Sequence, residues 1–174
     1  MLVSCSSDLP KTSNGSDRPT VGASTSAGSA AAVDLAVSQI NAGHPAQAVK
    51  ILQKASVDHP TDALILYNLA VALAATGDRV GSIGAYRKAL AVDPSNAAAL
   101  YNLAVAVTPT DRNEAIKLFT RAVKADPSKD PARLDLGLLL NEANRTKEAK
   151  EQFDKLIQAK SPLVKAIPAR YRTP

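Results

Sequence analysis

A seven-residue string that occurs twice places the strongest constraint on how this chain can fold. The string LYNLAVA stands at positions 66–72 and returns, unchanged, at positions 100–106. Each copy is rich in apolar residues, and a second amphipathic stretch follows it and ends in Asp-Pro, at Asp93-Pro94 and Asp126-Pro127. A helical hairpin repeated at a fixed period predicts a solenoid, in which each hairpin buries its apolar face against the next.

The same spacing extends to four copies of the hairpin. One landmark series, at nearly constant spacing, is formed by Leu35, Leu69, Leu103 and Leu136. Aromatic residues recur with the same period at Tyr86, Phe119 and Phe153, with Leu52 preceding them. These landmarks predict helices over residues 29–42, 45–58, 62–75, 79–92, 96–107, 112–125, 130–143 and 146–159.

Composition agrees with closely packed helices. Hydrophobic residues make up 45% of the 174 residues, but aromatic residues only 3%, and tryptophan is absent, so alanine and leucine must fill the core. Few segments alternate apolar and polar residues with the period of two that a half-buried strand needs. The chain is therefore predicted to be all-α.

The landmarks resemble those of the tetratricopeptide repeat family, whose pattern is W-x2-L-G-x2-Y, then A-x3-F, then P. The second copy supplies Leu66-x2-Leu69-Ala70, Ser82-x3-Tyr86 and Pro94, and the fourth supplies Arg133-x2-Leu136-Gly137, Ala149-x3-Phe153 and, one place late, Pro162. The resemblance implies a right-handed α-solenoid of four hairpins, at 29–62, 63–96, 97–129 and 130–161. A short capping helix over 162–167 and a tail to 174 are expected to follow, with the far side of the last hairpin only partly covered.

In this family the first helix of each hairpin lines a concave groove that binds a protein or peptide segment. The resemblance carries that role onto one stripe of this sequence: Val33, Val37, Leu64, Tyr67, Asn68, Val71, Tyr101, Asn102, Val105, Leu134 and Leu138, with Asp135 and Asn141 beside the last two. The stripe is mostly apolar and lacks the basic residues with which chaperone-binding relatives hold a terminal carboxylate. An apolar helix or extended segment is therefore the expected ligand.

No constellation for catalysis is present in the sequence. The two histidines, His44 and His59, fall beside a turn and beside a helix-ending proline, and no phosphate-binding loop or metal-spaced Cys/His set occurs. We therefore predict that the chain is not an enzyme and that it uses neither a cofactor nor a metal. Its net charge of +5 is spread along the helices rather than gathered on one face, so no nucleic-acid partner is expected. An RNA-binding helical repeat is disfavoured further by the period of the landmarks, which is that of tetratricopeptide repeats.

The segment 1–28 is expected to form a disordered leader, because it is rich in Ser, Thr, Gly and Asp. Within it, Leu2-Val3-Ser4-Cys5 resembles the box that directs lipidation of bacterial lipoproteins, and Cys5 is the sole cysteine. A basic, apolar signal of the usual length does not precede it in this sequence. The resemblance implies a lipid anchor at Cys5 as the only membrane attachment, an outer-membrane location facing the periplasm, and a role in pilus or secretion-complex assembly, as in tight-adherence (Flp) pilus lipoproteins or pilotins. The alternative is a cytosolic adaptor or co-chaperone without lipidation.

Overall fold

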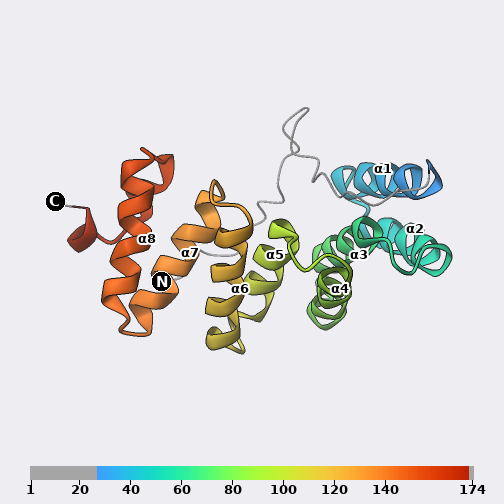
Figure 1. The fold of residues 1–174 in the computed structure, drawn as a ribbon. Coiled ribbons are helices and arrows are strands. Elements are labelled where there is room, and N and C mark those ends of the chain that lie inside the picture. Colours follow the sequence, from blue (N-terminus) through green and yellow to red (C-terminus); the bar gives the residue numbers. More distant parts are fainter. Residues whose placement is uncertain (1–26, 173–174) are drawn as a thin grey trace.

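The computed structural model describes residues 27–172, which form eight α-helices and two short 3₁₀ helices and contain no strand (Figure 1). The α-helices are α1 (Ala27–Asn41), α2 (Pro45–Asp58), α3 (Ala63–Ala75), α4 (Arg79–Val92), α5 (Ala97–Val107), α6 (Arg112–Ala125), α7 (Asp130–Glu142) and α8 (Thr146–Gln158). The 3₁₀ helices are η1 (Pro162–Ala166) and η2 (Ala169–Tyr171). The predicted all-α solenoid of four hairpins is confirmed, and α2, α4 and α6 have the predicted bounds. Because α1 begins at Ala27, the expected leader over 1–28 extends slightly too far.

Polar side chains fix where several of these helices begin. Asp62 accepts hydrogen bonds from the backbone N–H groups of Leu64 and Ile65, at 2.9 and 3.3 Å, at the start of α3. Asn96 does the same for Ala99 at 2.9 Å at the start of α5. Such N-caps satisfy donors that have no partner within the helix. The acidic and amide residues between hairpins are thus explained by the fold.

The turns inside the hairpins follow the sequence closely. Gly43 and Gly77 have φ angles of +81° and +85°, the left-handed conformation that glycine adopts without strain after a helix. The third hairpin has no such glycine, and α5 ends at Val107, as predicted. In the fourth hairpin, Asn144 takes the left-handed conformation at φ 59°.

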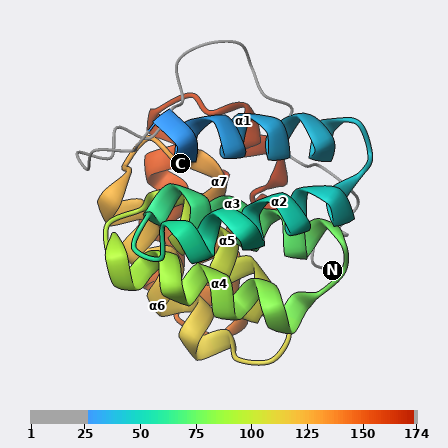
Figure 2. The same cartoon turned by 90° about the vertical axis from the view of Figure 1, so that its right-hand side faces the viewer.

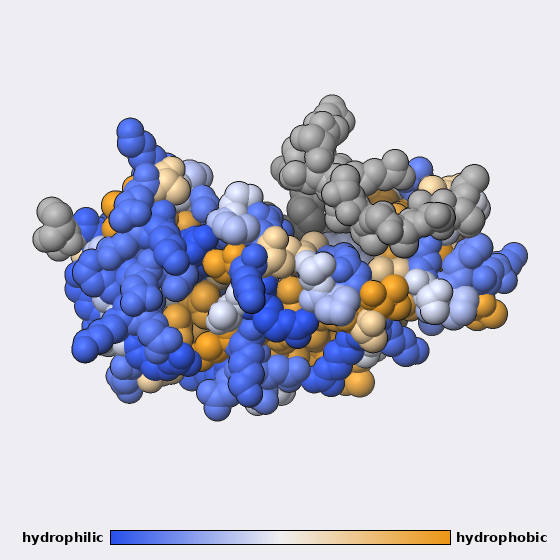
Figure 3. Space-filling view, viewed as in Figure 1, coloured by the Kyte–Doolittle hydropathy of each residue, from blue (hydrophilic) through white to orange (hydrophobic). Residues whose placement is uncertain are grey.

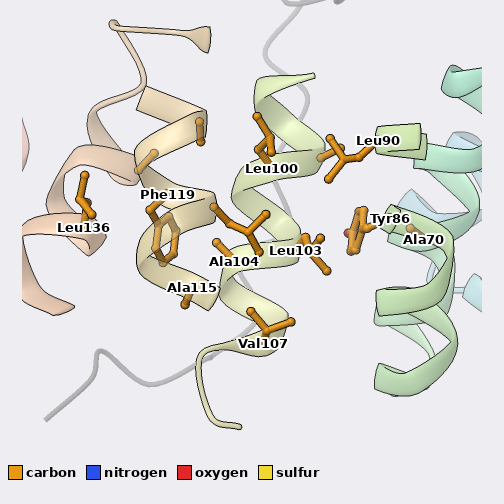
Figure 4. Packing of buried hydrophobic residues seen from close by; sticks show 14 of the residues in the cluster. Ala70, Tyr86, Leu90, Leu100, Leu103, Ala104, Val107, Ala115, Phe119 and Leu136 are labelled. Atoms are coloured by element: carbon orange, nitrogen blue, oxygen red, sulfur yellow. The ribbon is translucent and has the colours of Figure 1, made fainter. Parts of the chain in front are cut away.

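The hairpins stack in an elongated array, because each second helix packs on its own first helix and on the first helix of the next hairpin. Viewed from the end formed by α1 and α2, the later hairpins lie behind them (Figure 2). Small and large residues pack together in the core, both within a hairpin and between hairpins. Phe119 of α6 lies beside Ala104 of α5, and Leu103 points back towards Tyr86 of α4 (Figure 4). The chain therefore has one continuous core instead of separate domains.

The C-terminal cap is more complete than the sequence predicts. Instead of one helix over 162–167, two 3₁₀ turns pack on the last hairpin, and Ile167 and Tyr171 are buried. The centre of the Tyr171 ring lies 5.0 Å from that of Phe153, and the Tyr171 hydroxyl donates to Asn141 Oδ1 at 2.7 Å. Because Tyr171 packs on Phe153, the last hairpin is covered further than a helix over 162–167 alone would cover it.

Gly137 makes the last hairpin sensitive to a single methyl group. A Cβ atom at this position would stand 2.5 Å from Cε1 of Phe153, a ring that is completely buried and cannot move aside freely. We expect Gly137→Ala to lower the free energy of unfolding by about 1–3 kcal/mol, the usual cost of overpacking. Urea denaturation followed by circular dichroism measures this. Gly84→Ala is the matched control: it lies on a helix with open space around it. If both variants have the same stability, the close contact of α7 and α8 is not as described.

Candidate functional site

The stripe predicted to bind a partner lies along the first helices, and its members differ in accessibility. Val33, Asn68 and Leu134 are only 6%, 8% and 8% exposed, so their side chains belong largely to the packing of the array. The remaining members are half-buried: Val37 on α1, Leu64, Tyr67 and Val71 on α3, Tyr101, Asn102 and Val105 on α5, and Leu138 on α7. We call the half-buried members on α3, α5 and α7 the first-helix face. It presents apolar and tyrosine side chains from three consecutive hairpins. Orange and pale patches between blue, hydrophilic side chains mark apolar surface on the side of the array seen in Figure 3.

Two hydrogen bonds join neighbouring hairpins across this face. Asn102 Nδ2 donates to Tyr67 Oη at 3.2 Å, which connects α5 to α3. One repeat later the direction is reversed, because the Tyr101 hydroxyl donates to the carboxylate of Asp135 on α7. Each tyrosine thus reaches the polar residue at the corresponding position of the next first helix. The face is therefore a connected surface, and its tyrosines are oriented before any partner arrives.

The two asparagines of the repeated string have different surroundings. The Asn68 amide donates back to the carbonyl of Leu64 within its own helix, at 2.8 Å. Asn102 is more exposed, and its amide donates to Tyr67 and also interacts with the hydroxyl of Tyr86. Asn68 therefore serves its own helix, whereas Asn102 connects neighbouring helices.

Burial raises the pKa values of two phenols on this part of the array. The pKa of Tyr67 is raised, mainly because burial disfavours the phenolate, although the hydrogen bond from Asn102 opposes the shift. Burial also raises the pKa of Tyr86, and its neighbour Tyr67, whose ring centre lies 6.1 Å away, adds to the effect. Phenols are neutral at physiological pH in any case, and the raised pKa values move both hydroxyl groups further from ionisation.

The family resemblance places Leu134, Asp135, Leu138 and Asn141 in or beside the stripe on α7. Asp135 is the one carboxylate among them. Burial raises its pKa, and the hydrogen bond with Tyr101 acts in the opposite direction. Lys129 lies near the same tyrosine, with Nζ 5.6 Å from the centre of the ring. The ion pairs among residues 27–172 do not include one between Lys129 and Asp135. A partly desolvated negative charge therefore lies on an otherwise apolar face.

The raised pKa of Asp135 predicts a pH effect on stability. The usual pKa of this side chain is 3.8, so Asp135 of the unfolded chain loses its proton first as the pH rises. The free energy of unfolding therefore falls with rising pH until the pH passes the raised pKa of Asp135 in the folded protein. Asp135→Asn keeps an acceptor for Tyr101 and has no charge to bury. We expect the stability of this variant relative to the unchanged protein to increase between about pH 3 and pH 7. Urea denaturation at several pH values measures the difference, and a constant difference would contradict it.

Asn141, at the end of the stripe on α7, is occupied by the chain itself. Its Oδ1 accepts hydrogen bonds from the Tyr171 hydroxyl and from the guanidinium of Arg170. Sequence reasoning placed Asn141 beside the groove but missed η2, because so short a 3₁₀ turn has no periodic pattern. The C-terminal cap thus marks where the first-helix face ends.

A separate hollow lies on the other side of α3. It has a volume of about 410 Å³, and its lining consists of Ser56, Pro60, Leu66, Leu69, Leu73, Gly81, Gly84, Ala85 and Lys88. The next hairpin has Glu114 and Lys117 at the places of these glycines, and there the Arg87–Glu114 ion pair, at 2.9 Å, bridges α4 and α6. The hollow shares no residue with the first-helix face.

Residues 27–172 show neither a metal site nor a membrane-spanning helix. No group of three or more His, Cys, Asp or Glu side chains in this part of the chain is arranged to hold a metal ion. No helix within the described range has the length and apolar character needed to cross a membrane. Cys5, the predicted lipidation site, lies outside the described residues.

The described geometry defines the class of protein: a helical repeat scaffold with an apolar face across its first helices. Two sequence profiles described as tetratricopeptide repeat match the chain, one at residues 33–91 and 77–108 and the other at residues 110–170. The chain belongs to the tetratricopeptide repeat family. Proteins of this fold generally act as non-catalytic scaffolds that bind protein or peptide partners.

Solved structures with the same fold agree with this assignment. MamA is 23% identical at a TM-score of 0.69, over 77% of this chain and 79% of MamA. A tetratricopeptide repeat protein from Parabacteroides merdae is 20% identical at 0.68, over 82% of this chain and 56% of its own. Pseudomonas aeruginosa pilF is 27% identical at 0.64, over 73% of this chain and 59% of pilF. A comparison with curated proteins found no significant match.

Proposed function

We propose that the first-helix face binds an apolar segment of a partner protein, and that the scaffold is tethered in the bacterial cell envelope through a lipid at Cys5. The observation that carries the binding role is the half-exposed apolar surface running over α3 and α5, two helices without a single charged residue. Soluble helices normally keep charged side chains on their exposed side. A contiguous apolar surface of this kind is typical of a site for another protein.

The tyrosines give this surface the character of a binding site. Tyr67 and Tyr101 are held by cross-repeat hydrogen bonds, and the centre of the Tyr101 ring lies 5.7 Å from that of Phe119 beneath it. Large, rigid, amphipathic side chains lose little entropy on binding and carry much of the energy at interfaces. The binding role is tested by replacing both tyrosines with alanine, which must remove the partner while the helical fold remains.

The envelope role rests on the position of Cys5 and on the sequence around it. Val3-Ser4-Cys5 resembles the lipidation box, and a polar stretch separates Cys5 from α1. The similarity to pilF of Pseudomonas aeruginosa supports this direction. In this proposal the lipid holds the scaffold at the inner surface of the outer membrane, and the bound segment belongs to a component of a pilus or secretion complex.

Lipidation is tested directly by acyl labelling. The gene with its natural upstream sequence is expressed in a bacterium fed with an alkyne-tagged palmitate, and Cys5→Ser is compared with the unchanged protein. We expect label in the unchanged protein, in the membrane fraction, and loss of both signals in the variant, because only a thiol in the box accepts the diacylglyceryl group. An unlabelled, soluble protein in both cases would replace this proposal with the cytosolic adaptor, and the binding role of the first-helix face would be unaffected.

A further inference from the structure

Contrary to the even spread of charge expected from the sequence, charge is distributed unequally between the two layers of helices in the central hairpins. In the central hairpins the second helices α4 and α6 contain one carboxylate, Glu114, and many cations: Arg79, Arg87, Lys88, Arg112, Lys117, Arg121 and Lys124. The first helices α3 and α5 contain no charge, and α1 contains only Asp34. A protein with a net charge of +5 therefore presents a first-helix layer that is neutral to acidic.

The charges of α7 sharpen this difference. Its only cation, Arg133, is buried and donates to the carbonyl of Pro127 at 2.7 Å and to Gln152 of α8, so it is committed to the scaffold. Glu142 lies 3.9 Å from Arg112. Asp130 stands in the first turn of α7, and Asp135 lies beside the first-helix face with Tyr101 as its bonded neighbour. Lys129 approaches the ring of the same tyrosine at 5.6 Å but forms no ion pair with Asp135.

The position of Asp135 follows the repeat. Asp34, Asn68, Asn102 and Asp135 recur with the period of the hairpins, so one register position is polar in all four first helices. At Asn68 and Asn102 the residue is neutral, and Asn102 still bonds the preceding tyrosine, although it donates from Nδ2 where Asp135 accepts. The charge at Asp135 is thus not needed to join the hairpins.

A partner that covers the face must compensate this charge. Covering Asp135 removes the water that still solvates the carboxylate, and an ionised group without a counter-charge is costly to bury. An apolar or acidic side chain placed there would be rejected, whereas a cation would be attracted by the neutral-to-acidic layer around it. The Tyr101 hydroxyl occupies one acceptor position, and an ionised carboxylate offers several.

We infer that the segment bound by the first-helix face carries a lysine or arginine that pairs with Asp135, next to apolar side chains that cover Tyr101 and Leu138. This inference rests on the proposed binding function and adds the chemistry of the ligand. A face with this requirement selects apolar segments that carry a suitably placed cation, whereas a purely apolar face would accept any apolar helix.

The inference is tested by selecting ligands from a random peptide library displayed on phage. The immobilised full chain is compared with Asp135→Asn and with Glu151→Gln, which removes an exposed charge on α8 away from the face. Clones are kept only if they fail to bind the double variant Tyr67→Ala/Tyr101→Ala. Every peptide that is counted therefore occupies the first-helix face. We expect apolar sequences with lysine or arginine enriched at one position on the unchanged protein and on Glu151→Gln, and no such enrichment on Asp135→Asn.

A double-mutant cycle then assigns the pairing. Replacing the selected basic residue by norleucine is expected to weaken binding at least about tenfold on the unchanged protein, and by about twofold at most on Asp135→Asn. Equal losses on both proteins, or clones without basic enrichment, would overturn the inference and leave the binding function standing. A library without any clone that depends on the two tyrosines would overturn the binding function itself.

Discussion

Replacing Phe119 by alanine is expected to lower the free energy of unfolding by about 3–5 kcal/mol, the range for removing a large aromatic ring from a packed core. Phe119 is 2% exposed, lies beside Ala104 and contacts the Tyr101 ring, so its loss leaves a cavity at the centre of the array. In a solenoid each hairpin is stabilised by its neighbours, and a central defect weakens both interfaces. The effect is therefore expected to extend beyond α5 and α6.

Urea denaturation followed by circular dichroism measures this loss. The control is Val80→Ala, because Val80 is 84% exposed on α4 and its truncation should change stability by less than about 0.5 kcal/mol. Hydrogen exchange adds a spatial readout: protection should fall in α5, α6 and α7 together. If Phe119→Ala and Val80→Ala unfold at the same urea concentration, the continuous core described for the four hairpins is not correct.

The second large effect is expected on binding. Replacing Tyr67 and Tyr101 together by alanine should lower the affinity for the bound segment at least about a hundredfold. Truncating a hot-spot tyrosine commonly costs about 2 kcal/mol or more of binding free energy. The two rings are the largest side chains of the first-helix face and lie on consecutive hairpins. Isothermal titration measures the change, with peptides enriched on the unchanged protein and taken before any clone is sorted by its binding to the double variant.

Tyr67→Phe separates the ring from its hydroxyl. This variant keeps the apolar contact and loses only the bond with Asn102, so we expect at most about a tenfold change in affinity. The far-ultraviolet circular dichroism of all variants must match that of the unchanged protein. An unchanged affinity in the double alanine variant, with the fold intact, would show that the segment binds elsewhere, for example in the hollow lined by Leu66 and Leu69.

Periodicity predicted the helices well because each signal is local. The left-handed glycines at 43 and 77, the capping residue Asn96 and the end of α5 at Val107 are all properties of a few neighbouring residues. The apolar spacing then predicts which side of each helix is buried, except in α1, where Leu35, the first residue of the leucine series, is 52% exposed. These features need no knowledge of distant parts of the chain.

Contacts between repeats were harder to predict. The bond between Asn102 and Tyr67 depends on the angle between two hairpins, and the cover of Phe153 by Tyr171 depends on the path of the chain after α8. Val33, Asn68 and Leu134 were assigned to the binding stripe by register alone, although close packing of neighbouring helices buries them. Register gives the direction of a side chain, but its exposure depends on how near the next helix lies.

Binding of the partner at the first-helix face is the expectation on which the proposed function depends. The most direct test is to place a photo-crosslinking benzoylphenylalanine at Val105 or Leu138, both half-buried on that face, or at exposed Val80 on α4, and to irradiate the native host. We expect a discrete protein adduct from Val105 and Leu138 and none from Val80. An adduct from Val80 alone, or adducts of equal yield from all three positions, would contradict binding at this face.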